Sequence, residues 1–128
     1  MNENYKNVIF LIEKSNTIFP QSFVIITACN PMDKILEHNE NKKLNADLLE
    51  KLNFFKREVM SITGSSLDLK HQEPSYLIEV GVKEGVKMGR SFNQRAIYWV
   101  NNDHLYLIDC TTEEKEPVGS FSEKIKFN

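Results

Sequence analysis

The clearest periodic pattern of hydrophobic positions in the chain lies between Asn41 and Met60. Apolar side chains recur there every three or four residues, which is typical of one face of an α-helix. These side chains are Leu44, Leu48, Leu52, Phe55 and Val59. The segment Asn41–Met60 is therefore predicted to be an amphipathic helix packed across a sheet, with Asn39 or Asn41 as its N-terminal cap.

A continuous apolar run, Phe23–Ala28, precedes this helix. Its sequence, FVIITA, is rich in β-branched residues, which predicts a central strand that is covered on both faces. The run is followed by Cys29, Asn30 and Pro31. A residue before proline favours extended backbone geometry, so Asn30 is expected to be extended at the exit of the strand. Residues 32–40 are polar and are predicted to form a loop.

A second strand and helix are predicted at Tyr76–Val80 and from Val82 to Phe92. The strand places Tyr76, Ile78 and Val80 on one face and Leu77 and Glu79 on the other. Three glycines at intervals of four residues follow, the first just before the helix and two inside it. These glycines are Gly81, Gly85 and Gly89. Because an interior glycine costs a helix about 1 kcal/mol relative to alanine, the stripe favours close packing of the helix on the sheet. A phosphate-binding loop is the alternative, but the GxGxxG pattern is absent.

The remaining segments have weaker patterns. Residues 3–14 place apolar side chains at helical spacing and are predicted to form a helix. Ser61–Leu69 is typical of a strand or a bent hairpin arm, and Ala96–Asn101 with His104–Cys110 of a β-hairpin that turns at Asn102 and Asp103. Residues 111–128 are charged and are expected to form a flexible tail with a last short strand at Lys124–Phe127.

This order of elements predicts a single α+β domain over residues 1–128. Hairpin-length links between the later strands favour an antiparallel-rich sheet. The expected architecture is a two-layer domain with a sheet of about five strands, on which two to three helices pack.

Composition narrows the possible functions. The formal charge is −2, from 16 basic and 18 acidic residues, so nucleic acid is not expected as the main partner. No apolar run approaches the roughly 20 residues of a membrane span, and the N-terminus lacks the basic region of a signal peptide, so a cytoplasmic location is expected.

Cys29 and Cys110 lack CxxC spacing and are expected to be free thiols. Neither a metal nor a cofactor is expected.

Polar residues that could form a binding site stand at the joints between the predicted elements. Asn41 and Asn45 lie one helical turn apart, so their side chains share a face, and Arg90 and Gln94 have the same spacing. Amides both donate and accept hydrogen bonds, a guanidinium can clamp an anion, and a carboxylate can accept a proton. A pocket of this composition suits a small polar or anionic ligand. The candidate residues are Asn30, Asn41, Asn45, Glu73, Ser75, Arg90 and Gln94.

Four short blocks of sequence resemble a family of small bacterial proteins known only as a domain of unknown function, of the type numbered in the three-thousands. The blocks are T-A-x-N-P at Thr27–Pro31, N-x3-N-x2-L at Asn41–Leu48, E-P-S at Glu73–Ser75, and R-x-F-x-Q-x-A at Arg90–Ala96. The chain departs from the family pattern at Gln72, where an aromatic residue is frequent, at Asn93, where glycine is usual, and at Arg95, where asparagine is common. The resemblance implies no activity.

Each candidate residue also has a purely structural interpretation. Asn30, Asn41 and Asn45 could satisfy turn and cap groups of the backbone, and Gln94 could tie a loop to the sheet. In that case the protein is an interaction module, a regulator or inhibitor of another protein, with no catalytic activity. His71 and His104 lack a second ligand at metal-binding spacing, Ser75 lacks the context of a hydrolase nucleophile, and Cys29 is more typical of a packed thiol than of a nucleophile.

Glu73 and Arg90 are predicted to meet. Pro74 fixes Glu73 at the entrance of one strand, and Arg90 ends the helix that follows. A helix of about eleven residues is roughly 16 Å long, so it can return along that strand to its start. The two side chains would form either a structural ion pair or part of a ligand site.

Overall fold

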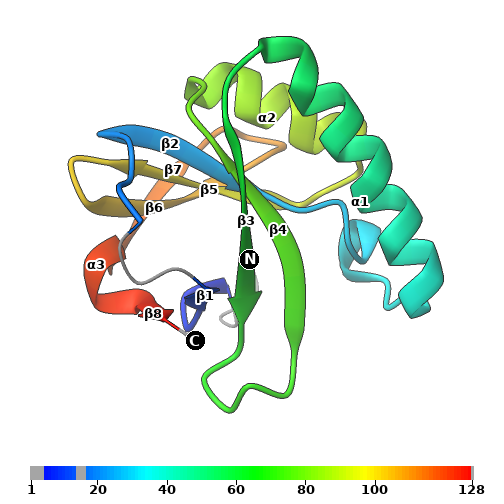
Figure 1. The fold of residues 1–128 in the computed structure, drawn as a ribbon, viewed down its shortest axis with the longest axis horizontal. Coiled ribbons are helices and arrows are strands. Elements are labelled where there is room, and N and C mark those ends of the chain that lie inside the picture. Colours follow the sequence, from blue (N-terminus) through cyan, green and yellow to red (C-terminus); the bar gives the residue numbers. More distant parts are fainter. Residues whose placement is uncertain (1–4, 14–16, 128) are drawn as a thin grey trace.

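The computed structural model describes residues 5–13 and 17–127, which form one sheet of eight strands with helices packed on it (Figure 1). The strand order is β7-β6-β5-β2-β4-β3-β1-β8. The strands are β1 (Ile9–Ile12), β2 (Ser22–Ile26), β3 (Val59–Ser65), β4 (Gln72–Ile78), β5 (Ala96–Asn101), β6 (His104–Asp109), β7 (Lys115–Ser120) and β8 (Ile125–Phe127). The α+β class is confirmed, but the expectation of about five strands is wrong. Neighbouring strands are antiparallel except for β1 and β8, so the sheet is mixed.

Strand β2 is the centre of the sheet, as its continuous apolar sequence predicts. It pairs with β5 on one side and with β4 on the other. Val24 and Ile26 face one hydrophobic core, whereas Phe23 and Ile25 face a second core on the opposite side of the sheet. Both faces of the strand are therefore covered.

Helices α1 (His38–Leu52) and α2 (Val82–Ser91) lie over the same face of the sheet (Figure 1). Helix α1 is shorter than predicted at its C-terminal end, because the chain passes through a 3-10 turn and reverses at Lys56, whose φ is 54°. Phe55 and Val59 still pack against the helical core, although Val59 already belongs to β3. The periodic pattern thus predicted the buried face correctly and the end of the helix wrongly. The predicted asparagine caps are also wrong, because the N-cap residue is Glu37.

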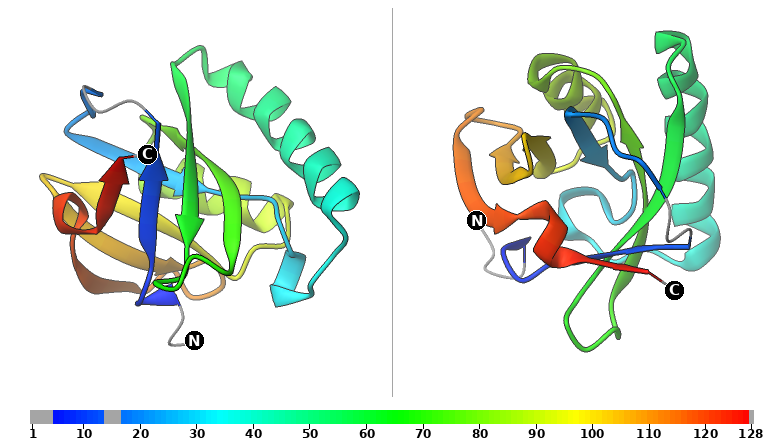
Figure 2. Two further views of the ribbon diagram at one scale, coloured as in Figure 1. Left: turned by 60° about the horizontal axis from the view of Figure 1, so that its bottom comes forward. Right: turned by 60° about the vertical axis from the view of Figure 1, so that its left-hand side comes forward.

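The second core lies between the sheet and its own curled edges (Figure 2). Strands β7 and β8 are at opposite edges of the sheet, yet only the short helix α3 (Phe121–Lys124) separates them in sequence. The sheet must therefore curl so that its two edges approach each other. Phe121 on α3 fills the space between them, where its ring contacts Phe10, Phe19 and Phe23.

This closure explains two corrections at the ends of the chain. The predicted helix at residues 3–14 contains strand β1, in which Phe10 and Ile12 are buried and alternate with partly exposed neighbours; residues 3, 4 and 14 lie outside the described residues. The expected tail at residues 111–128 instead contributes β7, α3 and β8. The short strand predicted at Lys124–Phe127 is confirmed as β8, Ile125–Phe127.

The strands near the predicted site differ slightly from expectation. Strand β3 covers the first part of the predicted Ser61–Leu69 arm, and β4 begins at Gln72, four residues earlier than predicted, so that Pro74 lies within it opposite Thr63. The β5–β6 hairpin is confirmed. Asn102 and Asp103 at its turn both have positive φ, as a two-residue turn of this type requires. Within the described part of the chain, every helix is too short or too polar to span a bilayer.

Candidate functional site

Asn30 follows the end of β2 and is the centre of a network of side-chain hydrogen bonds. Its backbone is left-handed, with φ of 49° and ψ of 61°, so the predicted extended geometry before Pro31 is wrong. Asparagine tolerates this conformation because its short amide bonds locally. The Asn30 N–H donates to Asn41 Oδ1 at 2.9 Å, and Asn30 Oδ1 accepts from Asn41 Nδ2 at 2.9 Å and from the Leu36 N–H at 3.0 Å. These bonds fix the orientation of the amide, whose Nδ2 donates to Glu73 Oε2 at 2.8 Å.

Asn45 lies one turn after Asn41 on the same face of α1 and ties the helix to two strands. It is only 6% exposed. Its Oδ1 accepts from the Ala28 N–H at 2.8 Å, and its Nδ2 donates to the Pro74 carbonyl at 2.8 Å. The pairing of β2 with β4 ends at Ile26 and Tyr76. Just beyond this point, the Asn45 side chain bridges the two segments in place of direct backbone hydrogen bonds.

Glu73 is a half-buried carboxylate that forms no ion pair with the residues that the structure describes. Burial raises its pKa, the hydrogen bond from Asn30 opposes that shift, and the negative charge of Asp33 adds to it. Asp33 is itself paired with the guanidinium of Arg95 at 3.0 Å. Among residues 5–13 and 17–127, no group donates to the second oxygen, Oε1. A buried carboxylate in a structural role is usually compensated by a cation, so Glu73 is the unusual group of this cluster.

Ser75 and Gln94 lie beside the cluster and have structural partners. The Ser75 hydroxyl donates to the backbone carbonyl of Glu73 at 3.0 Å. Gln94 Nε2 donates to the carbonyl of Cys29 at 3.1 Å and to that of Phe92 at 3.3 Å. Both side chains are buried, so they brace the segments that carry Asn30 and Glu73.

Arg90 does not belong to this cluster, and the predicted Glu73–Arg90 pair is wrong. Its Nε donates to the carbonyl of Cys110 at 2.5 Å, and its guanidinium lies 3.4 Å from Glu113. The segment after α2 does return toward the start of β4, because Gln94 donates to the carbonyl of Cys29, whose thiol lies 3.8 Å from the Pro74 carbonyl. Arg90, however, extends toward the turn between β6 and β7.

Replacing Arg90 with alanine is therefore expected to lower the free energy of unfolding by only about 1–2 kcal/mol, because the side chain loses two hydrogen bonds to backbone carbonyls. Half of the side chain is exposed, so little charge is buried. Urea unfolding of the variant measures this, with Lys87→Ala on the exposed part of the same helix as control. A loss of about 3 kcal/mol or more would instead indicate a broken buried ion pair.

Three residues outside the predicted site interact electrostatically with Glu73; they are Tyr5, Asp33 and Tyr98. Tyr5 donates its hydroxyl to the carboxylate of Asp33, and burial, followed by this hydrogen bond, raises the pKa of Tyr5. Tyr98 donates to the carbonyl of Tyr5. Arg95 and Asp33 form the ion pair described above. Only Arg95 carried a signal in the sequence, as a departure from the family pattern; no local pattern marks Tyr5 or Asp33.

The thiol of Cys29 has the properties of a packed side chain rather than of a nucleophile. Burial raises its pKa, and Asn45 Nδ2 donates to its sulfur at 3.3 Å. The chemistry available here is therefore hydrogen bonding and proton acceptance by Glu73. In the part of the chain that the structure describes, no three His, Cys, Asp or Glu side chains are grouped so that they could hold a metal ion.

Of the seven predicted residues, Asn30, Asn41, Asn45, Glu73, Ser75 and Gln94 thus lie in one region, and Arg90 lies apart from it. No curated protein and no solved structure matches the chain. The family described as protein of unknown function (DUF3293) matches residues 26–97, which is more than half of the chain and runs from the end of β2 into β5. The chain therefore belongs to this family of proteins of unknown function.

Proposed function

We propose that the protein binds a small polar ligand beside Glu73, with an N–H or O–H group of the ligand donating to Oε1, the carboxylate oxygen that accepts no hydrogen bond from the described residues. The observation that carries this proposal is the half-buried, uncompensated carboxylate held by the Asn30 amide. Asn30 is itself fixed by Asn41 and Leu36, so the acceptor is oriented before a ligand arrives. Such preorganisation reduces the entropy lost on binding.

The charges around Glu73 favour a neutral or cationic ligand over an anionic one. Arg90, the group expected to clamp an anion, lies at the other side of α2. Arg95 is neutralised by Asp33, so Glu73 leaves the region with a net negative charge at neutral pH. An amide, alcohol or amine fits this environment better than a carboxylate or a phosphate does.

The direct test is a thermal-shift screen of polar metabolites on the wild-type protein and on Glu73→Gln. A ligand at 100 times its Kd should stabilise the wild type by about 2.7 kcal/mol and raise Tm by several degrees. In Glu73→Gln the amide oxygen accepts from Asn30, so the NH2 group faces the ligand's donor. Loss of a hydrogen bond to a charged group should then weaken binding by at least about tenfold. Glu50→Gln, on the exposed face of α1, is the matched control and should bind as the wild type does.

Glu73→Gln is also expected to unfold at higher urea concentration than the wild type at pH 7. The folded-state pKa of Glu73 is raised by burial, so the ionised form opposes folding. The stabilisation that protonated Glu73 gives to the folded state is fully present below the unfolded-state pKa of about 4.3. It is lost as the pH rises through the folded-state pKa of Glu73. The advantage of the glutamine variant should therefore shrink as pH falls toward 4. Urea melts at a series of pH values measure it, and a wild type that is the more stable protein at pH 7 would contradict this account.

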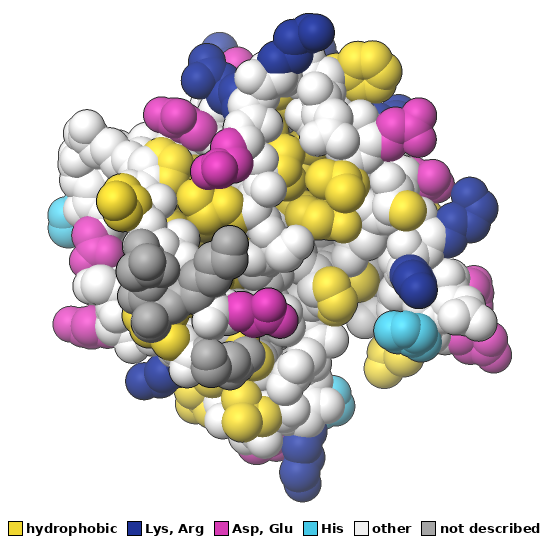
Figure 3. All heavy atoms as spheres, viewed as in Figure 1, with side chains coloured by type: hydrophobic (Ala, Val, Ile, Leu, Met, Phe, Trp, Pro, Cys, Tyr) yellow, Lys and Arg dark blue, Asp and Glu magenta, His cyan; other side chains and the backbone are white. Residues whose placement is uncertain are grey.

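An interaction module is the second candidate function, because the amides of Asn30, Asn41, Asn45 and Gln94 are satisfied within the protein. On the face shown in Figure 3, acidic and basic side chains are interspersed and hydrophobic side chains gather between them. The most exposed large apolar residues come from separate segments; they are Ile18, Ile35, Phe54 and Leu67. If no polar compound shifts the wild-type Tm, and Glu73→Gln is more stable than the wild type at pH 7, the results support this second function.

A further inference from the structure

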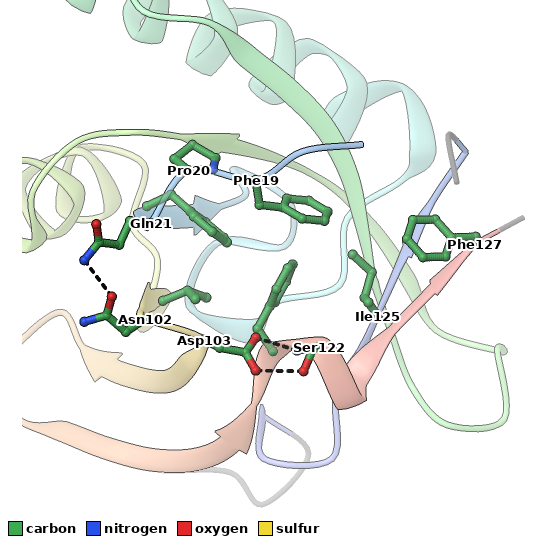
Figure 4. Close-up of a pocket in the computed structure, with 11 residues that line it drawn as sticks. Phe19, Pro20, Gln21, Asn102, Asp103, Ser122, Ile125 and Phe127 are labelled. Carbon is green, nitrogen blue, oxygen red and sulfur yellow. Dashed lines mark hydrogen bonds between the residues drawn. The ribbon is translucent and has the colours of Figure 1, made fainter. Parts of the chain in front are cut away.

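A cavity of about 430 Å³ opens into the second core, at the end of the sheet where α3 joins the two edges (Figure 4). Its walls are largely apolar and come from the segment before β2, from β2 and β5, from α3 and from β8. The apolar residues that line it include Phe19, Phe23, Val100, Phe121, Ile125 and Phe127. The volume lies within the roughly 300–1,000 Å³ typical of small-molecule sites.

The aromatic wall is held in place by its own packing. The Phe121 ring lies edge-on to Phe19, with centroids 5.1 Å apart, and edge-on to Phe23 at 5.2 Å. Phe19 stacks on Phe23 at 6.0 Å. At the rim, by contrast, Phe127 remains 45% exposed. The wall is therefore preformed, and an apolar ligand could cover the exposed ring without rearranging the core.

One carboxylate stands at the mouth of this cavity. Asp103 is the only ionisable side chain among the lining residues of the described chain. Its oxygens accept from the hydroxyls of Ser120 and Ser122 and from the Ser122 N–H at 2.7–2.9 Å, and these bonds lower its pKa. The group is consequently ionised at neutral pH without a cationic partner in the pocket. At another side of the mouth, Gln21 Nε2 donates a hydrogen bond to Asn102 Oδ1 at 2.6 Å, which links the segment before β2 to the β5–β6 turn.

We propose that this cavity binds a small arylalkylamine, with the aromatic group of the ligand against Phe19, Phe121 and Phe127 and its ammonium group beside Asp103. Aromatic rings provide both apolar contact and a favourable electrostatic surface for a cation. A single carboxylate at the mouth attracts an ammonium group and repels a carboxylate of the same shape. This site is separate from the one proposed around Glu73, and either can fail without the other.

The test compares three probes with the same aromatic body: 3-phenylpropylamine, 3-phenylpropan-1-ol and 3-phenylpropanoate. Chemical-shift titrations of the full 15N-labelled chain give a Kd for each and show where it binds. We expect saturable shifts at the backbone amides of Val100, Asn102 and Ile125. Two unit charges about 4 Å apart in water interact by about 1 kcal/mol, so the amine should bind about fivefold tighter than the alcohol, and the alcohol about fivefold tighter than the carboxylate.

Two variants with matched controls separate the roles of charge and ring. Asp103→Asn should make the Kd values of the three probes similar, with the Kd of the alcohol nearly unchanged. Asp68 is another exposed aspartate that is bonded to a serine hydroxyl, and Asp68→Asn should keep the wild-type order of affinities. Phe127→Ala should weaken all three probes by about threefold or more, whereas Phe54→Ala, which changes an exposed ring outside the cavity, should not.

Several results would overturn the proposal. They are equal affinities of the three probes for the wild type, tightest binding by the carboxylate, the absence of saturable shifts, or shifts centred on Asn30 and Glu73 that vanish in Glu73→Gln. The wild-type ranking and its location decide the matter even if Asp103→Asn fails to fold.

Discussion

Replacing Asn45 with alanine is expected to lower the free energy of unfolding by about 2 kcal/mol. The substitution removes the one acceptor that the described residues offer to the buried Ala28 N–H. It also removes one of the hydrogen bonds to the Pro74 carbonyl, which still accepts from the Thr27 hydroxyl at 2.8 Å. Each buried group left without a partner costs about 1–3 kcal/mol. The better helix propensity of alanine offsets only about 0.5 kcal/mol of this loss.

Urea unfolding followed by the fluorescence of the single tryptophan, Trp99, measures the effect. Asn39→Ala is the matched control, because Asn39 lies on the same helix with its side chain exposed, so this variant should be unchanged or slightly more stable. Asn45→Asp keeps an acceptor for the Ala28 N–H but points a second oxygen at the Pro74 carbonyl, and it should be at least as destabilised as Asn45→Ala. A cost below about 1 kcal/mol for Asn45→Ala would mean that water replaces the lost amide.

The elements that were predicted from the sequence are those whose local pattern and tertiary environment agree. The run at β2 is apolar throughout because both of its faces are buried. The β5–β6 hairpin carries Asn102 and Asp103, the residue types that tolerate the left-handed turn it adopts. Glycines at spacing four predicted a helix in close contact with the sheet. In each case the local sequence alone nearly suffices to specify the conformation.

The wrong predictions concern short strands that depend on distant partners. Strand β1 is four residues long and pairs with β3 and β8, more than fifty and more than one hundred residues away. Over so few residues, helical and extended spacing cannot be distinguished. Strand β7 is mostly exposed and contains Pro117 and Gly119, so its composition is that of a loop. Pairing across the sheet decided both conformations, and no local pattern contains that information.

The candidate site was predictable where spacing along one helix face determined it. Asn41 and Asn45 share a face of α1, and both do meet the exit of β2. Arg90 was misplaced because the length of α2 determines how far it returns but not on which side a residue lies. Gly89 contacts the sheet, and the next residue is turned by about 100° around the helix axis, toward the β6–β7 turn. Arg90 therefore does not reach Glu73, although the length of the helix had predicted that the two side chains meet.

Gly85→Ala is expected to lower the free energy of unfolding by about 2 kcal/mol, even though alanine favours helix by about 1 kcal/mol. A Cβ atom at this position would lie 2.8 Å from Ile97 Cδ1 and 2.9 Å from Val24 Cγ1, both closer than van der Waals contact allows. Ile97 Cδ1 ends a flexible side chain, but Val24 is β-branched, fully buried and fixed in the central strand. Helix α2 must therefore move away from the sheet, and overpacking of this kind costs about 1–3 kcal/mol.

Gly81→Ala is the matched control for this variant. A Cβ at Gly81 meets only the carboxylate of Glu84, an exposed and flexible group that can move aside, so the change should stay within about 1 kcal/mol. Urea melts of both variants, followed by circular dichroism, compare them directly. If Gly85→Ala were more stable than the wild type, helix propensity would outweigh the contact, and α2 would not be held against Val24 as closely as the structure places it. A selective loss in Gly85→Ala would establish that the glycine stripe exists because the helix backbone touches the sheet.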